Sequence, residues 1–207
     1  MNEGYEEVLR AIASSEPTPG GGSVSALSLA HAQSLTIMVA RLTMGKEKWA
    51  DGQVMAESII SKWDPKIAAS IGLAEKDAQA FNQVMGAYRL PKKDEKEREL
   101  RNSSIREATI GAARAPLEIA KEALELLLDI EKFSDLCNSN ALTDLASAAE
   151  LCGSAMVIAS MNVRINLDFI EGDDVDDLSK QLDALMGAHT SSLEMIRSKV
   201  SERLDWK

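Results

Sequence analysis

The feature that most constrains this chain is a glycine-rich loop followed by a long apolar segment. The loop is Pro17–Ser23 (PTPGGGS), and the apolar segment runs on to about Leu42. Prolines remove backbone donors and glycines remove side chains, so this backbone can turn tightly or closely approach another group. Apolar residues lie on every side of the segment when it is drawn as a helix, which is typical of a helix buried in a bundle. We therefore expect a central bundle helix from Ser23 to about Met44, with Ser23 as its N-cap.

A membrane span is a poorer interpretation of that segment. A span needs about 20 nearly unbroken apolar residues, and His31, Gln33 and Arg41 interrupt this one. No signal-peptide pattern is present in the first ten residues, which include three glutamates. We therefore expect a cytoplasmic protein with no membrane partner.

The remaining chain predicts further helices and no strands. Hydrophobic content is 45% and prolines number only 5, so long elements around a sizeable core are expected in the 207 residues. Apolar residues recur at steps of three or four over Val54–Tyr88, where Pro65 predicts a kink or break near Asp64. The other expected helices are Glu3–Ala13, one from Asp94 that Pro116 bends or restarts, Leu142–Asn166 and one spanning Leu178–Val200.

The predicted fold is therefore all-α. We expect one domain over residues 1–207, a bundle of long antiparallel helices with two of them, Ser23–Met44 and Leu142–Asn166, fully buried.

Charge and cysteine content exclude some classes of function. The net charge is −10, and duplex binding needs a basic face, so nucleic acid is not an expected partner. Two cysteines fit a reduced compartment. These cysteines and the two histidines are dispersed without metal-ligand spacing, so no metal site is predicted.

Asp77 is the most informative candidate residue, because it shares an apolar helix face with Ala74, Phe81 and Tyr88. Burial raises the pKa of a carboxyl group and can suit it to proton transfer near neutral pH. The alternative interpretation is a buried carboxylate paired with a basic side chain of another helix.

Other polar candidates have ordinary alternatives. Asp144 lies near the start of Leu142–Asn166, where an acidic residue often favours the helix dipole. Asn162 and Asn166 share a face at the far end of that helix, and Asp144 is about 27 Å from Asn162 at 1.5 Å per residue. His31 and His189 fall on apolar faces, where a lone histidine is usually a core or interface residue.

Basic residues in two loops are candidates for binding an anion. They are Lys46, Lys48, Lys92 and their neighbours, which lie on either side of the Asp77 segment in an otherwise acidic chain. Solvated surface is the commoner fate of lysine. The glycine loop likewise has two interpretations, a ligand contact or a tight helix start.

Six short motifs together resemble one known family, the cyclodeaminase family, which includes the C-terminal domain of formiminotransferase-cyclodeaminase, stand-alone relatives and bacterial methenyltetrahydrofolate cyclohydrolases. The motifs follow in order along nearly the whole chain: Pro17–Ser23 (PTPGGGS), Leu42–Lys46 (LTMGK), Asp77–Phe81 (DAQAF), Tyr88–Lys92 (YRLPK), Asn138–Asp144 (NSNALTD) and Asn162–Leu167 (NVRINL). One departure is Cys137, which stands where the family usually has glycine and suggests a different backbone angle there.

The resemblance implies an all-helical homodimer or higher oligomer, assembled through helix faces, that acts on tetrahydrofolate one-carbon derivatives without a metal or organic cofactor. It implies that Asp77 is the catalytic carboxylate. The implied substrate contacts are Pro19, Gly20, Gly21, Gly22, Ser23, Asn138, Asp144, Asn162 and Asn166, with Lys46, Lys48 and Lys92 as candidates for the anionic glutamate tail.

Three functions remain open from the sequence. The first is formiminotetrahydrofolate cyclodeaminase, in which N10 attacks the formimino carbon and ammonia leaves, with one acid/base group moving both protons. The second is methenyltetrahydrofolate cyclohydrolase, in which water attacks the same carbon to give 10-formyltetrahydrofolate. The third is a non-catalytic helical dimerisation module that keeps the fold.

Overall fold

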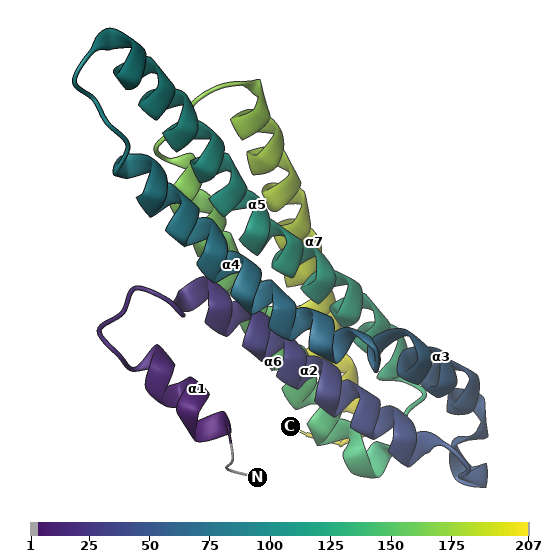
Figure 1. Cartoon of the computed structure of the whole chain (residues 1–207). Helices are drawn as coiled ribbons and strands as arrows, with labels where there is room; N and C mark the ends of the chain where they lie inside the picture. Colours follow the sequence, from purple (N-terminus) through teal and green to yellow (C-terminus); the bar gives the residue numbers. More distant parts are fainter. Residues whose placement is uncertain (1–3, 207) are drawn as a thin grey trace.

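The computed structural model describes residues 4–206, and within that range the chain is helical with no strand (Figure 1). The elements are α1 (Tyr5–Ile12), α2 (Gly21–Thr43), η1 (Glu47–Gly52), α3 (Gln53–Trp63), α4 (Lys66–Tyr88), α5 (Glu95–Phe133), η2 (Ser139–Ala141), α6 (Leu142–Leu167) and α7 (Asp173–Arg203). The all-α prediction is confirmed. Glu3, the predicted start of the first helix, lies outside the described residues.

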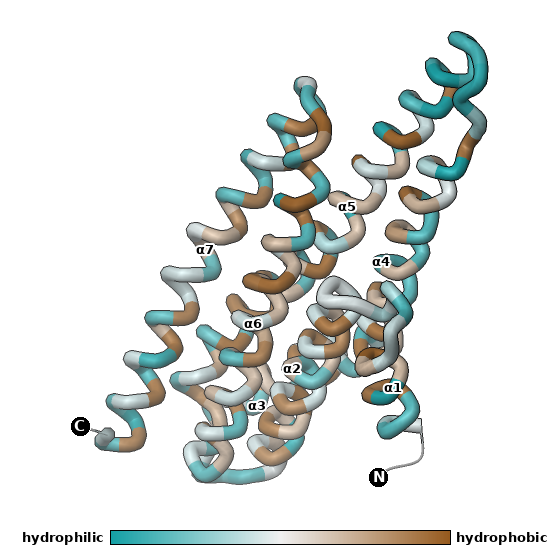
Figure 2. The backbone as a smooth tube through the Cα atoms, turned by 90° about the vertical axis from the view of Figure 1, so that its left-hand side faces the viewer, coloured by the Kyte–Doolittle hydropathy of each residue, from teal (hydrophilic) through white to brown (hydrophobic). Residues whose placement is uncertain are grey.

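Helices α2 and α6 form the centre of the bundle. α2 packs against α6, α4 and α3, while α5 packs against α4, α6 and α7. Figure 2 shows hydrophobic residues concentrated along the facing sides of α2, α5 and α6. The largest side chains of this core, all less than 2% exposed, include Leu29, Ile37, Trp63, Phe133 and Met156.

Neither central helix is covered on every side in the single chain. Both are long and apolar enough to cross a membrane by length and composition, yet 61% and 50% of their apolar windows are buried in the bundle, as in core helices. The predicted full burial therefore holds only for part of each circumference. Exposed apolar side chains remain at Met38 and Leu42 of α2 and at Val157, Met161 and Ile165 of α6.

The start of α2 differs from the prediction. The helix begins at Gly21 with Gly20 as its N-cap residue, so Ser23 lies inside the first turn. The Ser23 hydroxyl donates to the carbonyl oxygen of Ala74 in α4, at 3.0 Å. The serine therefore joins two helices and does not cap one, because α4 lies directly beside the first turn of α2.

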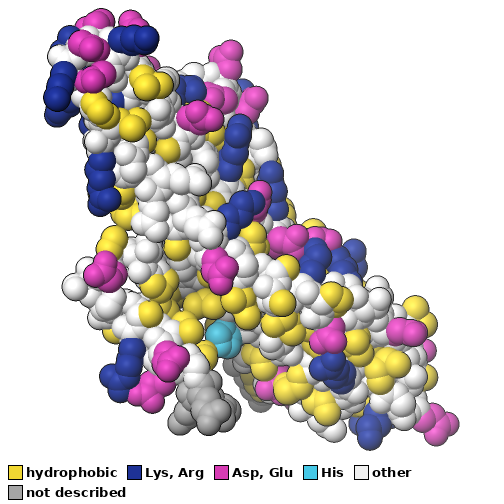
Figure 3. Space-filling model, viewed as in Figure 1, with side chains coloured by type: hydrophobic (Ala, Val, Ile, Leu, Met, Phe, Trp, Pro, Cys, Tyr) yellow, Lys and Arg dark blue, Asp and Glu magenta, His cyan; other side chains and the backbone are white. Residues whose placement is uncertain are grey.

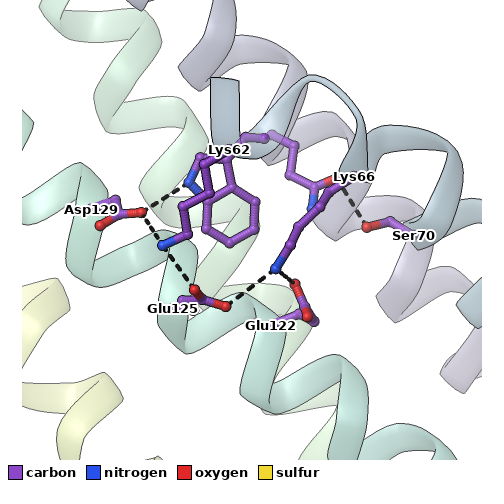
Figure 4. Close-up of polar contacts among 8 residues, drawn as sticks. Lys62, Lys66, Ser70, Glu122, Glu125 and Asp129 are labelled. Carbon is purple, nitrogen blue, oxygen red and sulfur yellow. Dashed lines mark hydrogen bonds and ion pairs between the residues drawn. The ribbon is translucent and has the colours of Figure 1, made fainter. Parts of the chain in front are cut away.

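Pro65 divides the predicted Val54–Tyr88 helix, as expected. α3 ends at Trp63, and α4 begins at Lys66 with Pro65 as its N-cap residue. Ion pairs to α5 hold both sides of the break: Lys62 Nζ lies 2.7 Å from Asp129 Oδ2, and Lys66 Nζ lies 2.8 Å from Glu122 Oε2 (Figure 4). The break changes the direction of the chain, and α3 and α4 both remain packed against α2 and α5.

Pro116 does not restart its helix, contrary to one of the predicted outcomes. α5 runs continuously through Pro116 from Glu95 to Phe133. A proline lacks the N–H that would bond the carbonyl four residues earlier, here that of Ala112. The Asn166 side chain supplies the missing donor, since its Nδ2 lies 3.1 Å from Ala112 O. Helix α6 thereby compensates for the proline in α5.

Candidate active site

A cavity of about 180 Å³ lies where the N-terminal end of α2 meets α4, α5 and α6. It brings together six of the predicted site residues: Gly20, Gly21, Gly22, Asp77, Asn162 and Asn166. These residues come from three separate stretches of sequence. Only helix packing makes them neighbours.

Asp77 is half-buried and faces the first turn of α2. Its Oδ2 lies 3.4 Å from the Ser23 hydroxyl. Burial raises the pKa of the Asp77 carboxyl above its usual range, and hydrogen bonds from the Ser23 hydroxyl and backbone only partly offset this. Among residues 4–206 no basic side chain forms an ion pair with it, and the adjacent Lys76 pairs with Glu118. The alternative of an ion-paired structural carboxylate therefore does not describe this site.

Gly22 lies so close to Asp77 that no side chain fits between them. A Cβ atom added at Gly22 would lie 2.2 Å from Asp77 Oδ1 and 2.5 Å from Asp77 Cγ. Gly21 is different, because a Cβ there would meet Asn162 Nδ2 at 3.5 Å, an ordinary contact. The last glycine of the run, Gly22, is thus required by packing against the Asp77 carboxyl group. The sequence alone left the glycine run undecided between a ligand contact and a tight helix start.

Asn162 and Asn166 of α6 line the cavity, and their side-chain NH2 groups are engaged in hydrogen bonds. Asn162 Nδ2 donates to Ile158 O at 2.9 Å, and Asn166 Nδ2 donates to Asn162 O at 2.7 Å as well as to Ala112 O. In the described part of the chain neither Oδ1 atom accepts a hydrogen bond. The lining therefore combines a carboxyl of raised pKa with two amide oxygens, which can accept from N–H groups of a flat heterocycle.

Four lining residues were not predicted as site residues: Pro17 and Thr18 of the glycine loop, Phe81 and Ala112. Phe81 was assigned to the apolar face and instead borders the cavity beside Asp77. Ala112 gave no signal of its own. The proline four residues later was the only hint that its carbonyl needs an outside donor.

Several predicted site residues lie elsewhere in the single chain. α2 has 23 residues, so its far end is about 33 Å from the cavity at 1.5 Å per residue. Pro19 is in the glycine loop but does not line the cavity. The structure places Lys46, Lys48, Asn138 and Asp144 near the far end of α2, and Lys92 in the loop between α4 and α5.

Asn138 has a structural explanation in this chain. Its backbone N–H donates to Thr43 Oγ1 and its Nδ2 donates to Leu42 O, both at 3.0 Å. The loop before α6 is thereby attached to the C-terminal end of α2. Cys137 is fully buried, and its backbone does not adopt positive φ, so this loop does not need the glycine usual in the family.

No metal site emerges from the described residues. Within residues 4–206 no three His, Cys, Asp or Glu side chains come together as ligands. The chemistry available at the cavity is therefore that of one carboxyl group, two amides and a glycine backbone.

Comparisons with known proteins agree with the motifs. A model of the formiminotransferase-cyclodeaminase family matches residues 4–184. The chain is 31% identical to a methenyltetrahydrofolate cyclohydrolase of Methylorubrum extorquens over 205 residues, which cover 97% of this chain and 99% of that protein. It is 30% identical to the rat formimidoyltransferase-cyclodeaminase over 84% of its own length, but spans only 31% of the rat protein.

The fold is also that of a solved relative. The structure is similar to the crystal structure of a formiminotetrahydrofolate cyclodeaminase from Thermotoga maritima, with a TM-score of 0.87 and 27% identity. The match covers 98% of this chain and 97% of the other.

Proposed function

Because the chain belongs to the formiminotransferase-cyclodeaminase family, we propose that it is an enzyme of folate one-carbon metabolism whose reaction takes place beside Asp77. The first candidate reaction is cyclodeamination of 5-formiminotetrahydrofolate to 5,10-methenyltetrahydrofolate and ammonia. The observation that supports it best is the carboxyl of raised pKa on the wall of the cavity, which forms no ion pair with any side chain of residues 4–206.

In this reaction N10 of the folate attacks the formimino carbon, so the C–N10 bond forms and a tetrahedral carbon results. The Asp77 carboxylate accepts the proton that N10 loses. The same group, now protonated, donates to the departing nitrogen as its bond to the carbon breaks and ammonia leaves. One group can act in both steps only if its pKa is close to the working pH, which burial of Asp77 favours.

The remaining lining residues support binding in this proposal. The Oδ1 atoms of Asn162 and Asn166 accept N–H groups of the pterin. The backbone of Gly20 and Gly21 admits the flat ring to the N-terminal end of α2. Neither step requires a metal or an organic cofactor, and activity should therefore survive dialysis against EDTA.

Hydrolysis of 5,10-methenyltetrahydrofolate is the second candidate. It is supported by the Methylorubrum cyclohydrolase, which matches this chain over nearly the whole length of both proteins. Here water attacks the bridging carbon and Asp77 accepts its proton. The protonated Asp77 then donates to N5 as the bond from that carbon to N5 breaks, and the carbon-bound hydroxyl loses its proton to solvent to become the formyl oxygen of 10-formyltetrahydrofolate. Both reactions pass through a tetrahedral carbon at the same place.

The methenyl absorbance separates the candidates. Purified protein is mixed with 5-formiminotetrahydrofolate or with 5,10-methenyltetrahydrofolate. Formation of methenyl with release of ammonia supports the first reaction, and accelerated loss of methenyl supports the second. If the protein changes neither rate, it is a non-catalytic helical module and the proposed function is wrong.

The role of Asp77 is tested by Asp77→Asn, which keeps the shape of the side chain. We expect turnover to fall by about 10²- to 10⁴-fold, the usual contribution of a positioned acid/base. Circular dichroism verifies the fold of the variant. A folded Asp77→Asn protein with full turnover would rule out the assignment.

We also propose that the chain assembles as a homodimer or higher oligomer. The exposed apolar residues of α2 and α6, Met38 and Met161 among them, support an interface on this side of the bundle. Light scattering measures the mass in solution, and Met161→Glu should shift it toward the monomer.

A further inference from the structure

The cavity beside Asp77 is too small for a whole reduced folate. Small-molecule sites usually measure about 300–1,000 Å³, whereas this cavity measures about 180 Å³. It has room for the pterin or the one-carbon centre but not also for the aminobenzoyl ring and the glutamate. If the proposed function is correct, the rest of the substrate must lie on the surface outside.

One surface leads directly away from the cavity along α4. Phe81 borders the cavity, and Met85 and Tyr88 follow it at steps of four and three residues, so the three lie along one side of the helix. All three remain exposed, by 38%, 38% and 48%. We call them the α4 stripe. Two aromatic rings and a thioether provide the kind of apolar surface on which a flat benzoyl ring packs.

Arg101 of α5 lies at the outer end of the α4 stripe. Its Nε and Nη2 donate to the carbonyl oxygen of Tyr88 at 3.3 and 3.2 Å, and its guanidinium carbon lies 5.5 Å from the centre of the Tyr88 ring. These contacts hold the guanidinium in place with Nη1 still available.

The charge of Arg101 is not neutralised by the protein. Within residues 4–206 it forms no ion pair, although the chain is strongly acidic and two arginines of the same helix are paired, Arg98 with Glu95 and Arg106 with Asp174. Arg89 and Arg114 are likewise without an ion pair in that range, but of the three only Arg101 is held against Tyr88. A positioned guanidinium without a carboxylate partner is well suited to bind the carboxylate of a ligand.

We propose that the α4 stripe binds the aminobenzoyl part of the folate and that Arg101 binds a carboxylate of its second, γ-linked glutamate. The inference deepens the proposed function and rests on it. Tyr88 is 11 residues beyond Asp77, or about 16 Å along α4. By ordinary bond lengths the α-carboxylate of the first glutamate reaches about 10 Å and its γ-carboxylate about 13 Å from the one-carbon centre, and each further γ-linked residue adds about 6 Å. Arg101 therefore lies farther out than the carboxylates of a monoglutamate, at about the distance of the α-carboxylate of the second residue.

The opposite direction is unsuitable for an anionic tail. A groove of about 590 Å³ lies between α1 and α2, and its lining includes no lysine or arginine and only one titratable base, His31. Figure 3 shows hydrophobic side chains beside α1, whereas Lys and Arg side chains, interspersed with Asp and Glu, lie at the far end of the α4–α5 hairpin. The carboxylates of a glutamate tail would find no lysine or arginine partner in this apolar groove.

The test compares folates with one and three glutamates as substrates for wild type, Arg101→Gln and Arg98→Gln. For wild type we expect a lower KM for the triglutamate. In Arg101→Gln the ratio of the triglutamate KM to the monoglutamate KM should rise by about tenfold, the size of a lost charged hydrogen bond. Arg98→Gln is the matched control, one turn away on the same helix and already paired with Glu95. It should leave the ratio unchanged, and Arg101→Lys should restore part of it.

Each other outcome has a clear consequence. An unchanged KM ratio in Arg101→Gln, or an equal rise of the ratio in Arg98→Gln, overturns the proposed glutamate-binding site at Arg101, while the proposed function stands. Equal KM values of the wild type for the two substrates also overturn this site and leave the proposed function standing. A wild-type protein that turns over neither folate refutes the proposed function and the glutamate-binding site together.

Discussion

Replacing Gly22 by alanine tests the contact on which the candidate site depends. The new Cβ would lie 2.2 Å from Asp77 Oδ1 and 2.5 Å from both Cγ and Oδ2. Carbon and oxygen atoms normally stay well above 3 Å apart, so the carboxyl group must recede by about 1 Å or α2 and α4 must separate. Overpacking of this kind costs about 1–3 kcal/mol. Removing a glycine from a helix returns about 0.5–1 kcal/mol.

The difference of those two terms spans about 0–2.5 kcal/mol, so we expect Gly22→Ala to lower the free energy of unfolding by about 1 kcal/mol. Turnover should fall by about 10²-fold, because a displacement of about 1 Å at a reacting group has effects of that size. Urea unfolding followed by circular dichroism measures the first quantity, and the methenyl absorbance measures the second.

A double-mutant cycle identifies the cause. Asp77→Ala removes all three atoms that the new Cβ would meet, so Gly22→Ala in that background should be neutral or slightly stabilising. The coupling free energy should then be about 1–3 kcal/mol, as for residues in direct contact. Gly21→Ala is the control for stability, since its Cβ meets Asn162 Nδ2 at 3.5 Å and should cost nothing. Equal destabilisation by Gly22→Ala in both backgrounds, or wild-type stability and turnover in the single variant, would refute the reasoning.

Three further predictions follow from buried polar groups. Asn138→Ala should lower the free energy of unfolding by about 1–3 kcal/mol, because it leaves the Leu42 carbonyl without its donor. Chemical unfolding measures this change, and an unchanged stability would contradict the role of Asn138 in attaching its loop to α2. Asn166→Ala should destabilise the wild type more than the Pro116→Ala variant, because alanine at position 116 supplies its own N–H to the Ala112 carbonyl that Asn166 otherwise hydrogen-bonds. Equal losses of unfolding free energy in the two backgrounds would disprove this link. Burial lowers the pKa of His189, whose ring nitrogens have no hydrogen-bond partner within residues 4–206. Its folded pKa lies below the unfolded value of about 6.5, so the unfolded state binds the proton first and stability is lost as the pH falls below that value. The melting temperature should therefore drop less between pH 7.5 and pH 5.5 in His189→Leu than in the wild type, and an identical drop would show that His189 does not titrate in this way.

Much of the fold could be predicted because helices depend on local sequence. Apolar residues at steps of three and four marked the faces of the long helices, and Pro65 marked the break between α3 and α4. Pro116 shows the limit of such rules. A proline in a helix usually interrupts it, but a side chain of α6 replaces the lost donor, and no local rule contains that information.

The candidate site was predictable to the extent that its residues were locally unusual. Asp77 stood out as a carboxylate on an apolar face, and three glycines in a row are rare enough to attract notice. Lys46 and Lys48 were selected by charge alone, and the structure places them at the other end of α2. Phe81 was overlooked because an aromatic residue on an apolar face has nothing unusual about it.

What the sequence determined by itself was the set of helices, their apolar faces and the one carboxylate that conflicts with its face. It did so because helix periodicity relates residues a few positions apart. What only the tertiary structure decided is that the first turn of α2 meets Asp77, 55 residues further along the chain, across a contact with no room for a Cβ atom. The relative position of two packed helices depends on how all their side chains interdigitate, and no short stretch of sequence contains that information.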